Sequence, residues 1–169
     1  RALALQAAEA SIVLLKNDGV LPLSEDLASL HVTGPNADNP RALMGNYHGL
    51  NPHVVTPLQG LAARVPDRTN LVFTAGALLD RPKLHPDDWS VGEAGQADVT
   101  VAFLGLDGTL EGEEGDAVAS ASKGDRDDLG LPPGQLDFLR RMKEAGATLV
   151  VVLTGGSALA VPEVHELAD

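Results

Sequence analysis

A long acidic segment, residues 105–133, holds the densest set of side chains that could carry out chemistry. From residue 107 to residue 128 it contains eight acidic and two basic residues, a net charge of −6, which is half of the −12 of the whole chain. Glu111, Glu113 and Glu114 form a close group of carboxyl groups near its start. Neighbouring carboxyl groups disfavour each other's ionisation, and one that stays protonated can act as a general acid. The segment therefore predicts acid/base chemistry, while the alternative for such a run of charges is a solvated loop.

Arg126 lies in the same segment, in the run Gly124-Asp125-Arg126. Its guanidinium could bind a polar group of a ligand or keep a neighbouring carboxylate ionised. The many acidic oxygens could also hold a hard cation. However, their spacing does not match an EF-hand loop, and the five histidines are scattered without an HxH or HxxxH pair. We therefore predict no metal site.

Two glycine-containing segments, residues 34–38 and 154–157, follow apolar runs and could cradle a phosphate at a helix N-terminus. Neither matches a Walker A or a GxGxxG pattern. Both are more typical of turns, and the second predicts a tight strand-to-helix turn with Ser157 near the helix N-cap. Tyr47 stands in a glycine-bracketed loop, which suits either a ligand-facing position or a surface turn.

The elements that must position these side chains alternate between strand and helix patterns. Apolar runs typical of strands occupy residues 30–33, 71–74, 99–104 and 148–153. The last two are almost continuously apolar, as expected for strands covered on both faces of a parallel sheet. The order predicts an α/β fold, a three-layer sandwich whose mostly parallel sheet is flanked by helices. The acidic segment directly follows one of these strands, at the edge where such sheets bind ligands.

Helical spacing of apolar residues occurs at residues 2–15, 57–64 and 133–145. In the first of these, Leu5, Ala8, Ile12 and Leu15 share one face, which we expect to be buried. In the third, Gly146 is well placed to end the helix.

The composition of the 169 residues excludes several classes of protein. Without cysteine there is no disulfide scaffold, zinc ribbon or thiol nucleophile. The charge of −12 argues against nucleic acid or an anionic membrane surface as a partner, and no apolar run is long enough to span a bilayer. Only five aromatic residues are present, too few for a free-standing sugar-binding module built on an aromatic platform.

Taken together and in order, several segments resemble the C-terminal α/β-sandwich domain of glycoside hydrolase family 3. The resemblance covers nearly the whole chain, and the ordered set is specific although each motif alone is weak. The pattern GNYHG followed by TPLQG is more similar to the β-xylosidase-like branch than to the β-glucosidase-like ones. The segments that carry the resemblance are Glu9-Ala10-Ser11-Ile12-Val13-Leu14-Leu15-Lys16-Asn17, Leu21-Pro22-Leu23, Gly34-Pro35-Asn36-Ala37, Gly45-Asn46-Tyr47-His48-Gly49, Thr56-Pro57-Leu58-Gln59-Gly60, Leu110-Glu111-Gly112-Glu113, Gly124-Asp125-Arg126, Leu131-Pro132 and Gly156-Ser157-Ala158-Leu159.

The resemblance implies a domain organisation and a reaction. Residues 1–169 would be an incomplete sandwich domain, truncated at its C-terminus, and the catalytic (β/α)8 barrel with its Asp nucleophile would lie outside this chain. The full protein would be a retaining exo-β-glycosidase without a cofactor, most similar to enzymes acting on β-1,4-xylosides. Its partners would be an oligosaccharide or aryl glycoside and the barrel of the same protein.

The resemblance also implies residue roles. Glu111 takes the position of the general acid/base, with Glu113 and Glu114 as alternatives. Substrate-binding candidates are Tyr47, Asp125 and Arg126.

The sequence also allows three alternatives. The first is a β-glucosidase of the same family, and the second is a sandwich domain kept as a non-catalytic binding or dimerisation module. The third is a flavodoxin-like binder of nucleotides or cations that uses the acidic segment, which the absence of a phosphate-cradling motif disfavours.

Overall fold

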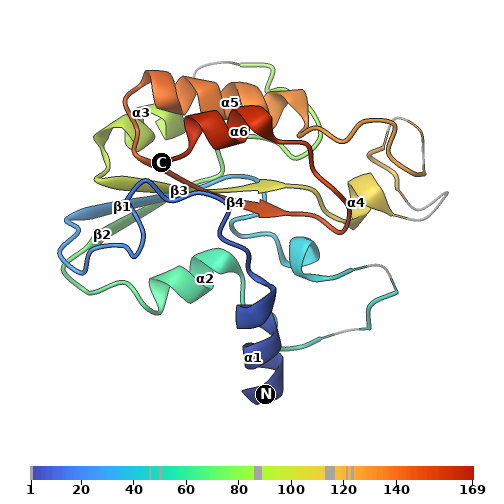
Figure 1. Ribbon diagram of the computed structural model, residues 1–169, viewed down its shortest axis with the longest axis horizontal. Helices are drawn as coiled ribbons and strands as arrows, with labels where there is room; N and C mark the ends of the chain where they lie inside the picture. The colour runs from blue at the N-terminus through green and yellow to red at the C-terminus, as the bar shows by residue number, and fades with distance from the viewer. Residues whose placement is uncertain are drawn as a thin grey trace.

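The computed structural model describes residues 2–45, 47–49, 51–85, 89–112, 117–120, 122 and 124–169. Its centre is a four-stranded parallel sheet with the order β2-β1-β3-β4 (Figure 1). Each strand lies within one residue of its predicted position, which confirms the α/β class. The strands are β1 (Ser29–Thr33), β2 (Asn70–Thr74), β3 (Val99–Gly105) and β4 (Leu149–Thr154).

Helices cover both faces of this sheet, which confirms the layered sandwich. Helices α3, α5 and α6 lie on one face and α2 lies on the other, while α4 lies beyond the ends of β3 and β4 (Figure 1). None of the described helices is long and apolar enough to cross a membrane. The helices are α1 (Ala2–Ser11), η1 (Pro40–Leu43, a 3-10 helix), α2 (Pro57–Ala62), α3 (Trp89–Gln96), α4 (Gly108–Glu111), α5 (Pro133–Glu144) and α6 (Pro162–Leu167).

Strand β3 is the centre of the core, because all seven of its residues are buried. Its side chains alternate between the two faces. Val101 and Phe103 pack in the cluster that α2 covers, whereas Ala102 and Leu104 pack in the cluster beneath α3, α5 and α6. Burial on both faces explains why this strand reads as a continuous apolar run.

The predicted helices at 57–64 and 133–145 are confirmed as the slightly shorter α2 and α5. Helix α2 begins with a capping box, in which Thr56 and Gln59 each accept a hydrogen bond from the other's backbone N–H. Gly146 follows α5 with a φ of 85°, the left-handed conformation that ends helices and that glycine adopts without strain.

The prediction for residues 2–15 is only partly correct. Helix α1 forms but ends at Ser11, and none of its residues is buried. The expected buried face is exposed, with Leu5 at 59% and Ile12 at 79%. Helical spacing identifies the helix, but it does not show which surface packs against it.

Asp98, which precedes β3, stabilises the amino ends of β1 and β3, at the end of the sheet opposite α4. Its carboxylate accepts hydrogen bonds from the backbone N–H groups of Ala28 (2.7 Å) and Ser29 (2.9 Å), and its own N–H donates to the Ser29 hydroxyl (2.9 Å). The backbone hydrogen bond from Ser29 lowers the pKa of Asp98 most, and the one from Ala28 lowers it further. These bonds set the register at which β1 and β3 begin.

Candidate functional site

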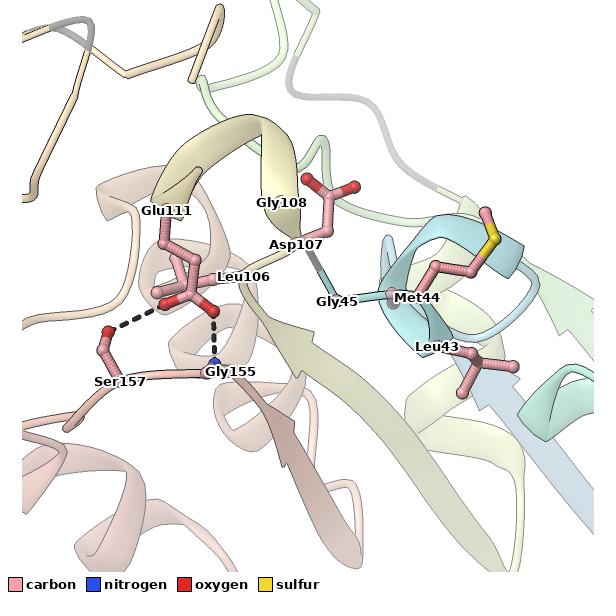
Figure 2. A pocket seen from close by; sticks show the side chains of 11 residues that line it. Leu43, Met44, Gly45, Leu106, Asp107, Gly108, Glu111, Gly155 and Ser157 are labelled. Atoms are coloured by element: carbon pink, nitrogen blue, oxygen red, sulfur yellow. Dashed lines mark hydrogen bonds between the residues drawn. The ribbon is translucent and has the colours of Figure 1, made fainter. Parts of the chain in front are cut away.

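A pocket of about 330 Å³ opens at the carboxyl ends of the strands, where three loops meet (Figure 2). Strand order reverses between β1 and β3, since β2 pairs with β1 on one side and β4 pairs with β3 on the other. Such a switch point is the usual ligand site of a parallel α/β sheet. We call this the carboxyl-edge pocket. It is lined by Ala42, Leu43, Met44, Gly45, Leu106, Asp107, Gly108, Glu111, Gly155, Gly156 and Ser157.

Two asparagines after β1 join the loops beneath the pocket. Asn36 is fully buried, and its side-chain amide donates to the Thr154 hydroxyl at the end of β4 (2.7 Å). The amide of Asn39 donates to the carboxylate of Asp107 after β3 (3.0 Å). Because these bonds connect β1, β3 and β4, the floor of the pocket is held by side chains from segments far apart in sequence.

Asp107 is buried and caps the short helix α4. One of its carboxylate oxygens accepts from the N–H of Thr109 (2.9 Å), while the other accepts from Asn39. An aspartate at the N-cap satisfies a backbone donor that the helix itself leaves unpaired. The cap fixes where α4 begins, and α4 is a single turn that ends at Glu111.

Glu111 turns its carboxylate toward the loop after β4 (Figure 2). One oxygen accepts a hydrogen bond from the backbone N–H of Gly156, and the other accepts from the hydroxyl of Ser157 (2.8 Å). Both oxygens are therefore engaged, and the carboxylate is held at the wall of the pocket between α4 and β4.

Arg126 reaches the same loop from the other side. One terminal nitrogen donates to the Ser157 hydroxyl (3.0 Å) and to the carbonyl of Ala158 (3.2 Å), and the other donates to the carbonyl of Gly130 (3.0 Å). The guanidinium thus ties the loop after β4 to the end of the acidic segment. Through Ser157, the side chains of Glu111 and Arg126 belong to one hydrogen-bonded bridge.

Gly105, the last residue of β3, approaches its neighbours too closely for a side chain. Its φ is 118°, and a Cβ there would lie 2.0 Å from the carbonyl oxygen of Thr154. Buried Gln135 of α5 accepts from the N–H of Gly105 (2.7 Å) and donates to its carbonyl (2.8 Å). The start of the acidic segment is therefore anchored both to β4 and to α5.

The structure distributes the predicted site residues unevenly. Glu111 lines the pocket, and Arg126 reaches it only through Ser157. Asp125 is exposed and outside the lining. Tyr47 is 86% exposed with a φ of 60°, also outside the lining, although Met44 and Gly45 just before it contribute to the wall. Glu113 and Glu114 lie outside the described residues.

Reasoning from sequence missed the roles of Asn39, Asp107 and Ser157. The prediction that Ser157 lies near a helix N-cap is wrong, because α6 begins only at Pro162 with Val161 at its N-cap. Ser157 instead donates to Glu111. The available signal was that all three residues follow strands of one parallel sheet, whose carboxyl ends meet at a single edge.

Two carboxyl groups line the pocket, those of Asp107 and Glu111. Asp107 is buried and caps α4, whereas Glu111 is half-buried, and both oxygens of each carboxyl group accept hydrogen bonds. Across the described residues, no group of three or more His, Asp or Glu side chains converges to hold a metal ion.

A family model described as the glycosyl hydrolase family 3 C-terminal domain matches residues 12–169. The chain is 35% identical over 154 residues to an exo-1,4-beta-xylosidase, xlnD, of Emericella nidulans. The aligned region covers 91% of this chain and 18% of the relative. It is 35% identical over 162 residues to beta-D-xylosidase 3 of Arabidopsis thaliana, covering 91% of this chain and 19% of the relative.

Solved structures show the same similarity. A GH3 exo-beta-xylosidase (XlnD) in complex with a xylobiose aziridine probe superposes with a TM-score of 0.82 and 31% identity, over 98% of this chain and 20% of the other. A GH3 beta-glucosidase of Bifidobacterium adolescentis superposes with a TM-score of 0.77 and 32% identity, over 99% of this chain and 23% of the other. The chain thus spans about a fifth of the length of these relatives.

Proposed function

Because this chain belongs to glycosyl hydrolase family 3 as its C-terminal domain, we propose that it supplies one half of the active site of a retaining exo-β-glycosidase. Retention requires two carboxyl groups about 5–5.5 Å apart, a nucleophile and an acid/base. In this proposal the nucleophile is an Asp of a (β/α)8 barrel in the same protein. The acid/base comes from the acidic segment of this chain.

The observation that carries the proposal is the position of Glu111. Its carboxylate stands at the wall of the carboxyl-edge pocket, at the end of a helix that is itself anchored by Asp107. A catalytic carboxyl group must be held in place, because proximity and orientation account for much of the rate. Glu111 would protonate the departing oxygen and then remove a proton from the attacking water.

The substrate we propose is a terminal β-1,4-linked xylose. The curated relatives with 35% identity carry the names exo-1,4-beta-xylosidase and beta-D-xylosidase. The second candidate is a terminal β-glucoside, which the similarity to the Bifidobacterium adolescentis beta-glucosidase favours. Tyr47, exposed just beyond Met44 and Gly45 of the pocket wall, is our candidate for contact with this sugar. Substrate contact by Asp125 and Arg126 stays a prediction.

Replacement of Glu111 in the protein that joins this chain to its barrel tests the proposal. We expect Glu111→Ala to lower kcat on aryl β-xylosides by roughly 10²–10⁴-fold, the usual contribution of general acid/base catalysis. Azide should restore turnover of substrates with activated leaving groups and yield a β-xylosyl azide, because this anion attacks the glycosyl-enzyme without needing a base. Rates on the matching β-glucosides assign the sugar.

Glu144→Ala is the matched control, since Glu144 is exposed at the far end of α5, outside the pocket lining. It should leave the rates unchanged. If Glu111→Ala is equally silent, Glu111 is not the acid/base. The same rates are then measured for Glu113→Ala and Glu114→Ala. A loss in either variant identifies that glutamate as the acid/base, whereas no loss in both indicates a sandwich domain without catalytic function.

A further inference from the structure

We propose that Ser157 and Arg126 are positioning residues that orient the carboxyl group of Glu111 for proton transfer. The inference rests on the proposed role of Glu111 and adds two residues to it. Their effect would pass through the bridge Arg126–Ser157–Glu111, whose two hydrogen bonds measure 3.0 and 2.8 Å.

The first step of the argument concerns the direction of the Ser157 hydroxyl. A serine hydroxyl has one proton to donate and can rotate to suit its neighbours. A guanidinium has only donors, so Arg126 can bond to Ser157 only at the lone pairs of its oxygen. The hydroxyl proton is thereby left to point at Glu111, and the serine becomes a directed donor.

The second step concerns how firmly Ser157 is held. Arg126 also bonds the carbonyls of Ala158 and Gly130, and the N–H of Ala160 donates to the carbonyl of Leu129 (2.8 Å). These bonds fix the loop after β4 against the end of the acidic segment. The Gly156 N–H therefore stays directed at Glu111 as well, and two donors from one loop set the plane of the carboxylate.

The same geometry argues against the phosphate site that the glycines of residues 154–157 suggest. A phosphate at this loop would need the Gly156 N–H and the Ser157 hydroxyl as donors. Both already donate to Glu111. The loop is thus arranged to bind the protein's own carboxylate.

The test measures how the rate depends on the leaving group, in the protein that joins this chain to its barrel. A substrate with a poor leaving group, phenyl β-xyloside, needs proton donation, whereas 2,4-dinitrophenyl β-xyloside does not. We expect Ser157→Ala to lower kcat/KM for the phenyl substrate by about tenfold, the effect of losing one hydrogen bond to a charged group. For the dinitrophenyl substrate it should stay within about twofold of the unmodified enzyme.

Two further variants separate positioning from folding. Ser157→Thr keeps the hydroxyl and should restore most of the rate on the phenyl substrate. Arg126→Met removes the donor that directs Ser157 and should reproduce the selective loss. Since Ser157 is exposed, its replacement by Ala is expected to leave the fold intact, and thermal unfolding verifies this.

Equal losses on both substrates, or no loss on either, would overturn the inference. Glu111→Gln, measured in parallel, shows which proposal has failed. If Glu111→Gln has the selective loss and Ser157→Ala does not, Glu111 is the acid/base and the bridge is only structural. If Glu111→Gln lacks the selective loss, the proposed function is wrong, and the inference fails with it.

Discussion

At the scale of single residues, the side chain of Gln135 links helix α5 to the beginning of the acidic segment. It is fully buried, and its amide makes three hydrogen bonds, two with the backbone of Gly105 and one to the carbonyl of Leu79 (2.7 Å). A buried polar group without a partner is costly, so this glutamine and the backbone around it depend on one another.

We expect Gln135→Ala to reduce the free energy of unfolding by about 3 kcal/mol, because it leaves several buried backbone groups without a partner. Chemical denaturation of the chain measures the change. Asp137→Ala, at an exposed position of the same helix, serves as the control and should stay within about 0.5 kcal/mol of the unmodified chain. Equal stabilities of the two variants would contradict a structural role for Gln135.

At the scale of elements, the backbone of Gly34, just after β1, lies directly against Phe103 of β3. Its φ is 100°, and a Cβ there would lie 2.1 Å from the carbonyl oxygen of Phe103. Gly19 has nearly the same φ, 106°, but a Cβ there would meet nothing within 4 Å. The two glycines therefore share a conformation and differ in the space around them.

This difference allows a matched prediction. Gly19→Ala should cost on the order of 1 kcal/mol, the strain of a left-handed backbone at a residue with a Cβ. Gly34→Ala should cost about 1–3 kcal/mol more, because β1 and β3 must also move apart. Thermal and chemical unfolding of both variants measure this, and equal costs would show that the close contact is not important.

The sequence predicts the elements whose pattern is local and strong. Strand β3 is found because both of its faces are buried, which makes it a continuous apolar run, and α5 because its apolar spacing is regular. Helices α3 and α6 are not predicted from periodicity, since each buries only one or two residues. The bond between Glu111 and Ser157 joins positions 46 residues apart, so no local pattern could reveal it.

At the scale of the whole molecule, this pocket is not a complete active site, because the retaining reaction needs a nucleophile as well as an acid/base. Of the two carboxyl groups that line the described pocket, Asp107 is buried beneath α4 as its cap, and Glu111 is the more exposed. In our proposal the nucleophile comes from the barrel, so substrate positioning and covalent chemistry both need the second domain.

We therefore expect this chain alone to leave aryl β-xylosides unhydrolysed while it remains folded. Initial rates with 4-nitrophenyl β-xyloside, together with circular dichroism, test both statements. The protein that joins the chain to its barrel is the positive control. Hydrolysis by the chain alone at the rate of that control would show that the site is complete without the barrel.

The bridge through Ser157 has a consequence for chain length. Glu111 and Arg126 both bond to this one side chain, so the chain is fixed on either side of the 14 residues that separate them in sequence, 112–125. In polymer terms, the entropy lost on closing a loop grows only with the logarithm of its length, about 0.6 kcal/mol for each doubling. Insertions or deletions between Glu111 and Arg126 should therefore change the length of this segment with little change in the free energy of unfolding.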